Sequence, residues 1–334
     1  NIRAGSGWSY GTGSRVLVMV DDMPILSADQ GEVEFNLIPM ENIEQMEIIK
    51  GASSSLYGSS ALNGVVNIKT KTPSLEPKTT IRSFVGLWDN PADLRNKWWG
   101  DTTRLRSGLS LTHSRKIKNF NMVLSASHYN DMGYIQTVNN VQTRLAANTK
   151  LVYDNISFGL NANYMQRESG MFVMWVNDTN TYTPLVDTDL PNFGSRFYID
   201  PSITIYQNFF KHTLRSRILK RNIGYGINSE TYITSLLTYN EYQNQFQTDQ
   251  TTLTSGITAT TLMGRTGAYG GQLNGLNLSG YAQLDYDFGK LNISTGARYE
   301  YFNLDSIVVG KPVYRGGINY ELTKGWNIRS SYGQ

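Results

Sequence analysis

Residues 155–164, NISFGLNANY, alternate between apolar side chains and small or polar ones. Ile156, Phe158, Leu160 and Tyr164 share one face, while serine, glycine and asparagine fill the positions between them. A repeat of two is that of a β-strand, whose successive side chains point to opposite faces. This stretch therefore predicts a strand with one apolar and one polar face.

The same alternation recurs along most of the chain after Thr79. Residues 281–288, YAQLDYDF, and 291–301, LNISTGARYEY, also place apolar and aromatic side chains opposite polar ones. Most of the predicted strands are roughly 9 to 14 residues long, against about 5 to 6 in globular proteins and about 9 to 11 across a membrane. We predict about thirteen strands, at 79–87, 104–116, 119–130, 141–153, 156–167, 196–207, 212–220, 230–246, 250–262, 276–288, 290–303, 312–322 and 326–334.

The connections between these strands alternate in length. Every second one is tight, as at Ile117-Lys118, Asp154-Asn155 and Gly289. The others are expected to be long, from Trp88 to Thr103, Asp131 to Asn140, Glu168 to Ser195 and Met263 to Gly275. A soluble sandwich gives no reason for this alternation, whereas an outer-membrane barrel has short turns on one side and long loops on the other. The sequence thus predicts an all-β membrane protein, an antiparallel transmembrane β-barrel whose apolar face meets lipid.

An odd number of strands predicts that the barrel is partial in this chain. Bacterial single-chain barrels have an even number of strands. We therefore expect further strands outside this sequence. Asn1 opens the chain with no signal peptide, so we also expect that the chain has been cut or processed.

The composition narrows the classes of function. The net charge of +3 over 334 residues is too small to argue for a nucleic-acid partner. There is no cysteine, which excludes a disulfide framework and thiolate metal sites. The three histidines are scattered, without the spacing of a metal site or a catalytic triad. We therefore expect no enzyme, no cofactor and no metal site.

Residues 1–73 have a different pattern. The segment RVLVMVDDMPI at 15–25 predicts a short apolar strand and an Asp-Asp turn, and residues 39–49 predict a helical turn followed by a strand. Next comes KGASSSLYGSSALNGVVNIKTKTP at 50–73, which is dense in glycine, alanine and serine. Such density is typical of a flexible linker, or of a loop whose backbone packs closely against a neighbour. The predicted strands on both sides favour the second interpretation.

These segments resemble the plug domain of TonB-dependent outer-membrane receptors. The resemblance begins at the turn of Asp21, Asp22 and Pro24 and continues through NIEQMEII at 42–49. It implies a large barrel, of about 22 strands when complete, with a small mixed α+β plug domain in the lumen. We assign residues 1–73 to the C-terminal part of the plug and 74–334 to the N-terminal part of the barrel. The most specific part of the motif is matched by Lys50, Gly51, Tyr57, Gly58, Ala61, Gly64 and Asn67.

Two departures from the family pattern concern turns. Asp22 stands where the family often has glycine, and Ala52 where it often has proline. From the resemblance we also expect that the first part of the plug, the energy-coupling box and the last barrel strands lie outside this sequence. In a plugged barrel, the small residues of 50–73 are expected to let the plug loops pack against the polar lumen wall.

The resemblance also implies a function. Members of this family import a ferric siderophore, haem, cobalamin, an oligosaccharide or a peptide through the bacterial outer membrane, with energy from a TonB-type coupling protein. The implied partners are therefore outer-membrane lipid, the coupling protein and such a ligand, and a surface lipoprotein or another complex subunit is a further candidate. Two alternatives are a passive porin-like channel and a barrel that docks a partner in a protein complex.

One predicted loop, WDNPADLRNKWWG at 88–100, combines aromatic and cationic side chains. Such groups together bind sugars or anionic chelates, although the same loop could instead be a surface cap or an anchor at the membrane interface. The candidate ligand contacts are Trp88, Arg95, Lys97, Trp98 and Trp99, with Trp175 from the third long loop and Tyr10 from the plug.

Overall fold

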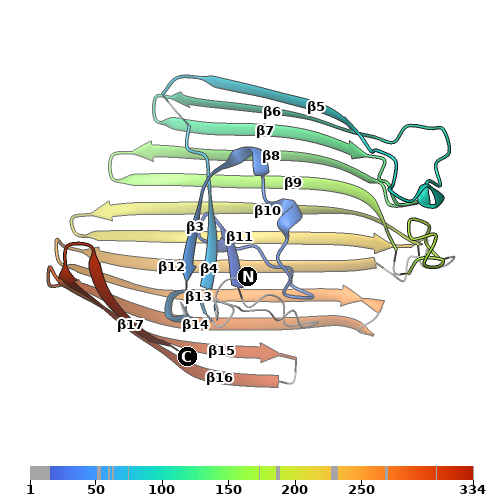
Figure 1. Cartoon of the computed structure of the whole chain (residues 1–334). Coiled ribbons are helices and arrows are strands. Elements are labelled where there is room, and N and C mark those ends of the chain that lie inside the picture. The colour runs from blue at the N-terminus through green and yellow to red at the C-terminus, as the bar shows by residue number, and fades with distance from the viewer. Residues whose placement is uncertain are drawn as a thin grey trace.

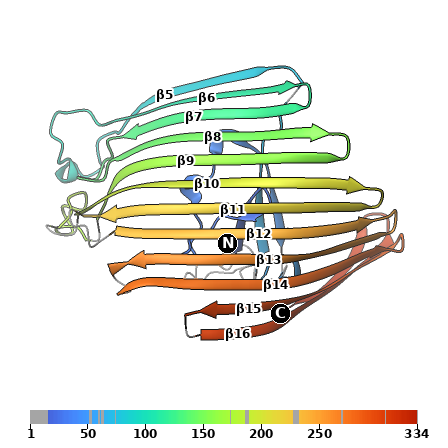
Figure 2. The same ribbon diagram turned by 180° about the vertical axis from the view of Figure 1, so that it is seen from behind.

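The chain forms two sheets. The four-stranded sheet lies within residues 16–70, and the thirteen-stranded sheet lies within residues 78–333. Figure 1 shows the small sheet in front of one face of the large one, and Figure 2 shows the opposite face. The structure, a computed structural model, describes residues 16–50, 54–58, 61, 64–73, 75–172, 174–185, 189–226, 232–267, 270–305 and 307–333.

The large sheet is an antiparallel meander in which each strand pairs with the next along the chain. Its order confirms the thirteen predicted strands, and within the described residues β5 and β17 are its unpaired edges. No helix in the described ranges is long and apolar enough to cross a membrane. The strands are β5 (Lys78–Leu87), β6 (Leu105–Ile117), β7 (Phe120–Asp131), β8 (Asn140–Tyr153), β9 (Ile156–Phe172), β10 (Asp189–Gln207), β11 (Phe210–Tyr225), β12 (Tyr232–Gln247), β13 (Thr251–Thr266), β14 (Gly271–Asp287), β15 (Leu291–Leu304), β16 (Ile307–Thr323) and β17 (Trp326–Gly333).

The tight turns are confirmed, and they all lie at one end of the sheet, which we call the turn end (Figure 1). Lys118, Asp154 and Asn208 open two-residue turns there with φ of 52°, 37° and 50°. Positive φ is typical of the primed hairpin turns that match strand twist. Asparagine and aspartate adopt this conformation more readily than most residues.

The opposite, loop end differs from the expected pattern. The connections 88–104 and 132–139 are long, as predicted, but the loop expected from Met263 to Gly275 is wrong, since β13 and β14 continue to Thr266 and from Gly271. Strands β9 and β10 likewise run past the predicted bounds, to Phe172 and from Asp189. Residues such as Gly170, Pro191 and Gly194 interrupt the apolar–polar alternation in these extensions, whereas backbone pairing does not depend on that alternation.

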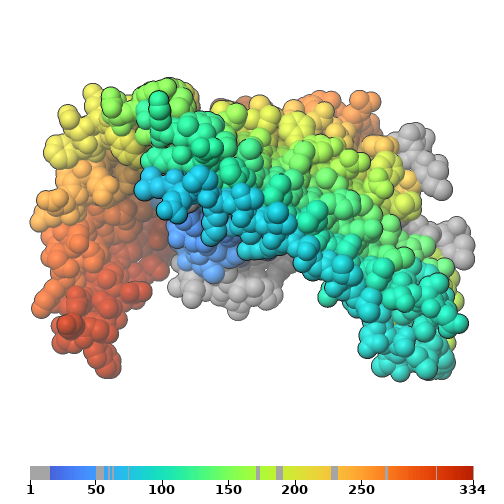
Figure 3. Space-filling model, turned by 90° about the horizontal axis from the view of Figure 1, so that it is seen from above, coloured from blue at the N-terminus to red at the C-terminus, as the bar shows by residue number. Residues whose placement is uncertain are grey.

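The two faces of the large sheet are chemically different, as the alternation predicts. On β9, Leu160 keeps 47% of its surface exposed, whereas Ser157 and Asn163 keep 5% and 2%. Figure 3 shows that the sheet curves, with the blue plug segment in its hollow. Apolar side chains therefore predominate on the convex face, and the concave face is mainly polar outside its contacts with the plug core, as in a membrane barrel with a filled lumen.

The small sheet has the order β2-β1-β4-β3, with β1 and β4 parallel. A 3-10 turn at Met40–Asn42 leads into β3, close to the helical turn expected at 39–43. The further elements are β1 (Val16–Val20), β2 (Met23–Pro24), β3 (Ile43–Lys50), β4 (Gly64–Thr70), the short helix α1 (Ser54–Tyr57) and a 3-10 turn at Phe35–Leu37.

The apolar core of the plug extends into the barrel wall. Val20, Ile25 and Leu37 of the plug are 0% exposed, and they belong to the same cluster as Met165 and Leu219 of the large sheet. Burial of apolar side chains contributes about 1.5–3 kcal/mol each. A four-stranded sheet this small gains much of that burial from the wall, so the two sheets form one packed unit here.

Candidate functional site

A series of arginines on the concave face joins the wall to the plug. In the sequence TLRSRILKRN of β11, Arg215, Arg217 and Arg221 lie at alternate positions and so point to the same side of the sheet. All three are buried or nearly so, at 9%, 0% and 4% exposed. Buried guanidinium groups require charged or hydrogen-bonding partners, and most of these partners come from the plug.

Arg217 is the most completely bonded of these side chains. Its guanidinium forms two bonds to the carboxylate of Asp200 on β10, at 2.8 and 2.5 Å. It also donates to the main-chain oxygens of Met23 at 2.9 Å, Pro24 at 3.0 Å and Val20 at 3.3 Å. A planar fork of five donors suits such a set of acceptors. One wall side chain thereby fixes the β1–β2 hairpin of the plug.

A second group of ion pairs lies around Glu34 of the plug. Glu34 accepts from Arg196 of β10 at 3.0 Å and from Arg221 at 2.9 Å. Arg221 also donates to Asp29 at 2.5 Å. Arg144 of β8 donates to the main-chain oxygen of Asn36 at 2.5 Å. Three wall arginines, one on each of three strands, therefore hold one edge of the plug by charge-assisted bonds, the stronger class of hydrogen bond.

The Asp-Asp turn predicted from the sequence lies between β1 and β2. Both Asp21 and Asp22 have positive φ, 51° and 66°. Aspartate tolerates this region of φ, so the turn accommodates Asp22 at the position where the family often has glycine. Asp21 accepts from the Thr70 main-chain N–H at 2.9 Å and from Asn161 of β9 at 3.0 Å.

The two adjacent carboxyls have opposite pKa shifts. Burial raises the pKa of Asp21, against its hydrogen bonds from Thr70. Burial acts in the same direction on Asp22, but Arg215 and Lys69 outweigh it and hold the pKa of Asp22 below its usual value. Lys69 lies 2.5 Å and Arg215 3.4 Å from the Asp22 carboxylate. Asp22 is therefore a charged contact between plug and wall.

The glycine-rich motif approaches the wall at Gly58. This residue has φ of +85°, and a Cβ placed on it would lie 2.5 Å from Oε1 of Glu300 on β15. Arg298, paired with Glu300 at 2.8 Å, also donates to the main-chain oxygen of Leu56 at 3.3 Å. At this position the close packing expected of the small residues is present.

The other motif residues support the plug internally. Asn67, 2% exposed, donates to Asp22 at 2.7 Å and to Glu47 at 3.4 Å. Ala61 is fully buried and belongs to a cluster against which Tyr57 packs. Pro24 pairs with Met19, and Lys50 ends β3 opposite Gly64. Gly51 lies outside the described residues.

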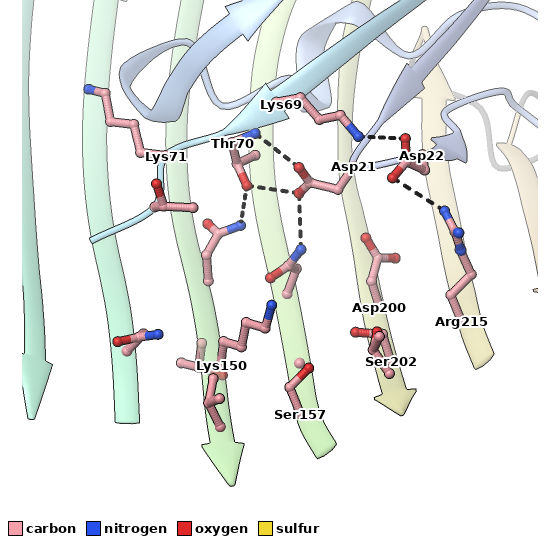
Figure 4. A pocket seen from close by; sticks show the side chains of 18 of the residues that line it. Asp21, Asp22, Lys69, Thr70, Lys71, Lys150, Ser157, Asp200, Ser202 and Arg215 are labelled. Atoms are coloured by element: carbon pink, nitrogen blue, oxygen red, sulfur yellow. Dashed lines mark hydrogen bonds and ion pairs between the residues drawn. The ribbon is translucent and has the colours of Figure 1, made fainter. Parts of the chain in front are cut away.

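A cavity of about 640 Å³ separates the plug from the wall toward the turn end. Figure 4 shows its labelled side chains, with Asp21, Asp22, Lys69 and Thr70 from the plug and Lys150 and others from the strands. Its wall side is lined by β6 to β11 and is rich in hydroxyl, amide and ammonium groups. A volume of this size is that of a small-molecule site, about 300–1,000 Å³.

The aromatic loop predicted to contact a ligand forms an ordered cluster at the loop end. Trp88 donates to Asp131 at 2.7 Å, and Asp131 also accepts from Tyr129 at 2.8 Å. The guanidinium of Arg106 lies 5.1 Å from the centre of the Trp88 ring. The aromatic rings of Trp88 and Tyr134 pack against each other, with their centres 4.9 Å apart.

The neighbouring tryptophans of the loop are also bonded. Trp98 donates to the Tyr134 main-chain oxygen at 2.9 Å, and Arg104 lies 4.7 Å from the centre of its ring. Trp99 is 7% exposed, so it packs inside the cluster and presents little surface.

The remaining candidate ligand contacts are less enclosed. Arg95 is exposed and pairs with Asp93 at 2.6 Å, and Lys97 is half-buried. Trp175 keeps 52% of its surface exposed and forms a bridge with Pro184. Tyr10 lies outside the described residues. The ligand roles of all these side chains stay predictions.

Sequence reasoning missed the arginines of the wall. Their spacing in β11 was visible, since Arg215 and Arg217 occupy polar-face positions of a strand. What the pattern could not supply was their partners. Arg217 bonds to plug residues almost 200 positions away, with a separation of 197 residues to Val20. Only the folded chain brings these groups together.

Comparison with known proteins agrees with this architecture. A family model described as the TonB-dependent Receptor Plug Domain matches residues 1–65, and one described as TonB dependent receptor-like, beta-barrel matches residues 54–334. The two matches overlap, so the boundary that we place after Pro73 stays a prediction.

Individual relatives match only part of the chain. The vitamin B12 transporter BtuB of Vibrio cholerae is 44% identical over 80 residues, which are 24% of this chain and 13% of that protein. The ferric enterobactin receptor PirA of Pseudomonas aeruginosa is 31% identical over 104 residues, 28% of this chain and 13% of that protein.

Solved structures share the fold along nearly the whole chain. The siderophore receptor PirA from Pseudomonas aeruginosa matches with a TM-score of 0.75 at 12% identity, over 96% of this chain and 53% of that one. The ferric citrate transporter FecA matches with a TM-score of 0.73 at 15% identity, over 95% and 53%. The chain thus spans about half the length of these receptors. Since the barrel family model covers well over half of its residues, the chain belongs to the TonB-dependent receptor family.

Proposed function

We propose that this protein is an outer-membrane receptor that imports a scarce small nutrient, a ferric siderophore or a cobalamin in the first instance, with energy from a TonB-type coupling protein. The observation that carries this proposal is the plug, held in the hollow of the barrel wall by buried wall arginines that bond to its carboxylates and main-chain oxygens. Under this proposal the loop end is extracellular, and the turn end is periplasmic.

The chemistry of the interface suits a plug that moves during transport. Removal of one partner of a buried ion pair destabilises a protein, because the other charge is left buried and unpaired. The net contribution of the intact pair to stability is nevertheless small, because desolvation offsets the attraction. Contacts around Glu34 and Asp22 can therefore exchange protein partners for water at modest net cost when the whole group is hydrated. The interface fixes the plug at rest and still permits rearrangement under applied energy.

The names of the relatives support this choice of ligand class. Those with sequence similarity are named for vitamin B12 and ferric enterobactin, and a structural neighbour is named for ferric citrate. The aromatic and cationic cluster around Trp88 and Arg106 supports a ligand contact at the loop end, since its members are held in place by Asp131. A passive channel is disfavoured, because the plug occupies the hollow of the wall.

Uptake by a deletion strain tests the proposal. We expect a strain without this gene to lose uptake of at least one of radiolabelled cyanocobalamin, ferric citrate and ferric enterobactin, and the gene supplied in trans to restore it. Dissipation of the proton-motive force should abolish that uptake while surface binding persists. Unchanged uptake of every ligand on deletion would favour a docking role, and uptake that survives dissipation would favour a passive channel.

A further inference from the structure

Three lysines of the barrel wall line the cavity at the turn end. Lys116 of β6, Lys150 of β8 and Lys211 of β11 all border the space between wall and plug. Figure 4 shows Lys150 among the side chains that surround it. In the described part of the chain, none of the three forms an ion pair with a carboxylate, while Lys211 lies 6.0 Å from the centre of the Tyr206 ring.

The carboxylates of the same cavity are all engaged. Asp22 is paired with Lys69 and Arg215, and Asp200 is paired with Arg217. Asp21 accepts from Thr70 and Asn161, and Glu44 accepts from the main-chain N–H of Thr72 at 3.0 Å. Hydrogen bonds from neutral groups leave the charges of Asp21 and Glu44 in place, but four carboxylates in the lining face six cationic side chains, Lys69, Lys71, Lys116, Lys150, Lys211 and Arg215. The lining is therefore net positive, and most of its cations come from the wall.

The rest of the wall lining can also donate hydrogen bonds. Ser157, Ser202 and Thr204 present hydroxyls to the cavity from β9 and β10, and Asn121 and Asn148 present amides from β7 and β8. Ammonium and hydroxyl donors together are the groups that bind carboxylate, catecholate or phosphate oxygens. A recessed lining with a net positive charge also concentrates anionic ligands.

We propose that this cavity is an exit vestibule for a negatively charged ligand, and that the imported nutrient is therefore an anionic ferric chelate rather than a neutral corrinoid. This inference rests on the proposed function. The cavity lies between plug and wall on the periplasmic side, where a ligand that has passed the plug emerges. A neutral ligand gains nothing from the three lysines, whereas an anionic chelate is drawn past the plug toward them.

An acidic segment of a periplasmic protein could use the same charges. The geometry favours a small ligand, because the lysines line a cavity of about 640 Å³ between two packed surfaces and do not form a flat patch. The two occupants differ in one respect that can be measured. Loss of a protein contact impairs transport of every ligand, whereas loss of an anion path impairs only charged ones.

The test compares two triple variants. K116Q/K150Q/K211Q removes the cavity charges, and K118Q/K290Q/K324Q removes three exposed charges from tight turns at the same end of the sheet. In cells, we expect the first variant to transport ferric citrate or ferric enterobactin roughly tenfold more slowly, with surface binding unchanged. The second variant should match the wild type. Cyanocobalamin, which is neutral, serves as the uncharged probe.

The outcomes distinguish a path for an anionic ligand from a contact with a periplasmic protein. Unchanged transport of the ferric chelates by the first variant overturns the inference, as does a wild type that imports only cyanocobalamin. Equal loss of charged and neutral ligands assigns the lysines to a protein partner instead. A wild type that imports none of the three ligands contradicts the proposed function itself.

A binding measurement gives a readout that does not require transport. Equilibrium dialysis of the detergent-purified protein against ferric citrate should show a site in the wild type and in the turn variant that the cavity variant lacks. Identical binding by all three proteins overturns the inference even where transport cannot be observed. Surface binding by the cavity variant in cells shows that it is folded.

Discussion

Replacement of Arg217 by alanine should be among the most destabilising single changes in the described part of the plug–wall interface. The substitution leaves the carboxylate of Asp200, 1% exposed, buried without its charge partner, and it removes the donors to Val20, Met23 and Pro24. Removal of one member of a buried pair costs about 3–5 kcal/mol. We expect a fall of that size in the free energy of unfolding, measured by denaturant titration in detergent, and faster proteolysis of the plug.

A double variant separates the charge from the packing. In Arg217→Met with Asp200→Leu, no buried charge is left unpaired, so part of the lost stability should return, although the three main-chain oxygens still lack their donor. Arg95→Ala, at an exposed pair with Asp93, should change little. An Arg217→Ala protein as stable as the wild type, or a double variant less stable than the single one, would contradict the assigned role.

Leu160→Arg should disrupt insertion into lipid. Leu160 lies on the convex face of β9, between Thr149 of β8 and Pro201 of β10. It is the fifth residue of β9 from the turn end, as β9 begins at Ile156, so it lies well inside the span of a membrane strand. An arginine on the lipid face near the midplane costs about 2–4 kcal/mol. Urea titration of folding into lipid vesicles measures this loss.

The neighbouring position provides the matched control. Asn161 lies on the opposite face of the same strand, lines the cavity and donates to Asp21 at 3.0 Å. An arginine there can donate to the same carboxylate and extend into the cavity, so Asn161→Arg should cost far less than Leu160→Arg. Equal losses at the two positions would refute the assignment of the convex face to lipid.

Much of the barrel could be predicted because its determinants are local. The alternation from Ile156 to Tyr164 involves only adjacent residues, so the sequence alone predicts which side chains of β9 lie on each face of the sheet. The predicted strand ends were less accurate. Arg265 of β13 pairs with Gln272 of β14 through the backbone, and this pairing leaves no apolar pattern in the sequence. The loop expected between Met263 and Gly275 was wrong for this reason.

The site was harder to predict because its contacts are distant in sequence. Trp88 and Trp98 were recognised as a group from one loop, but Asp131 and Tyr134, which hold them, come from the next hairpin. Lys116, Lys150 and Lys211 each look like an ordinary strand lysine, and only the pairing of β6 to β11 gathers them around one cavity.

The central claim, that the plug must move for a ligand to pass, can be tested directly with a disulfide. The sequence has no cysteine, and Asn42 of the plug donates to Ser125 of β7 at 3.0 Å, so Asn42→Cys with Ser125→Cys places one thiol on each side of this contact in a protein with no other cysteine. We expect energy-dependent uptake to stop when this pair is oxidised and to return on reduction, while each single variant transports normally. Uptake at the wild-type rate with the cross-link fully formed would contradict the account.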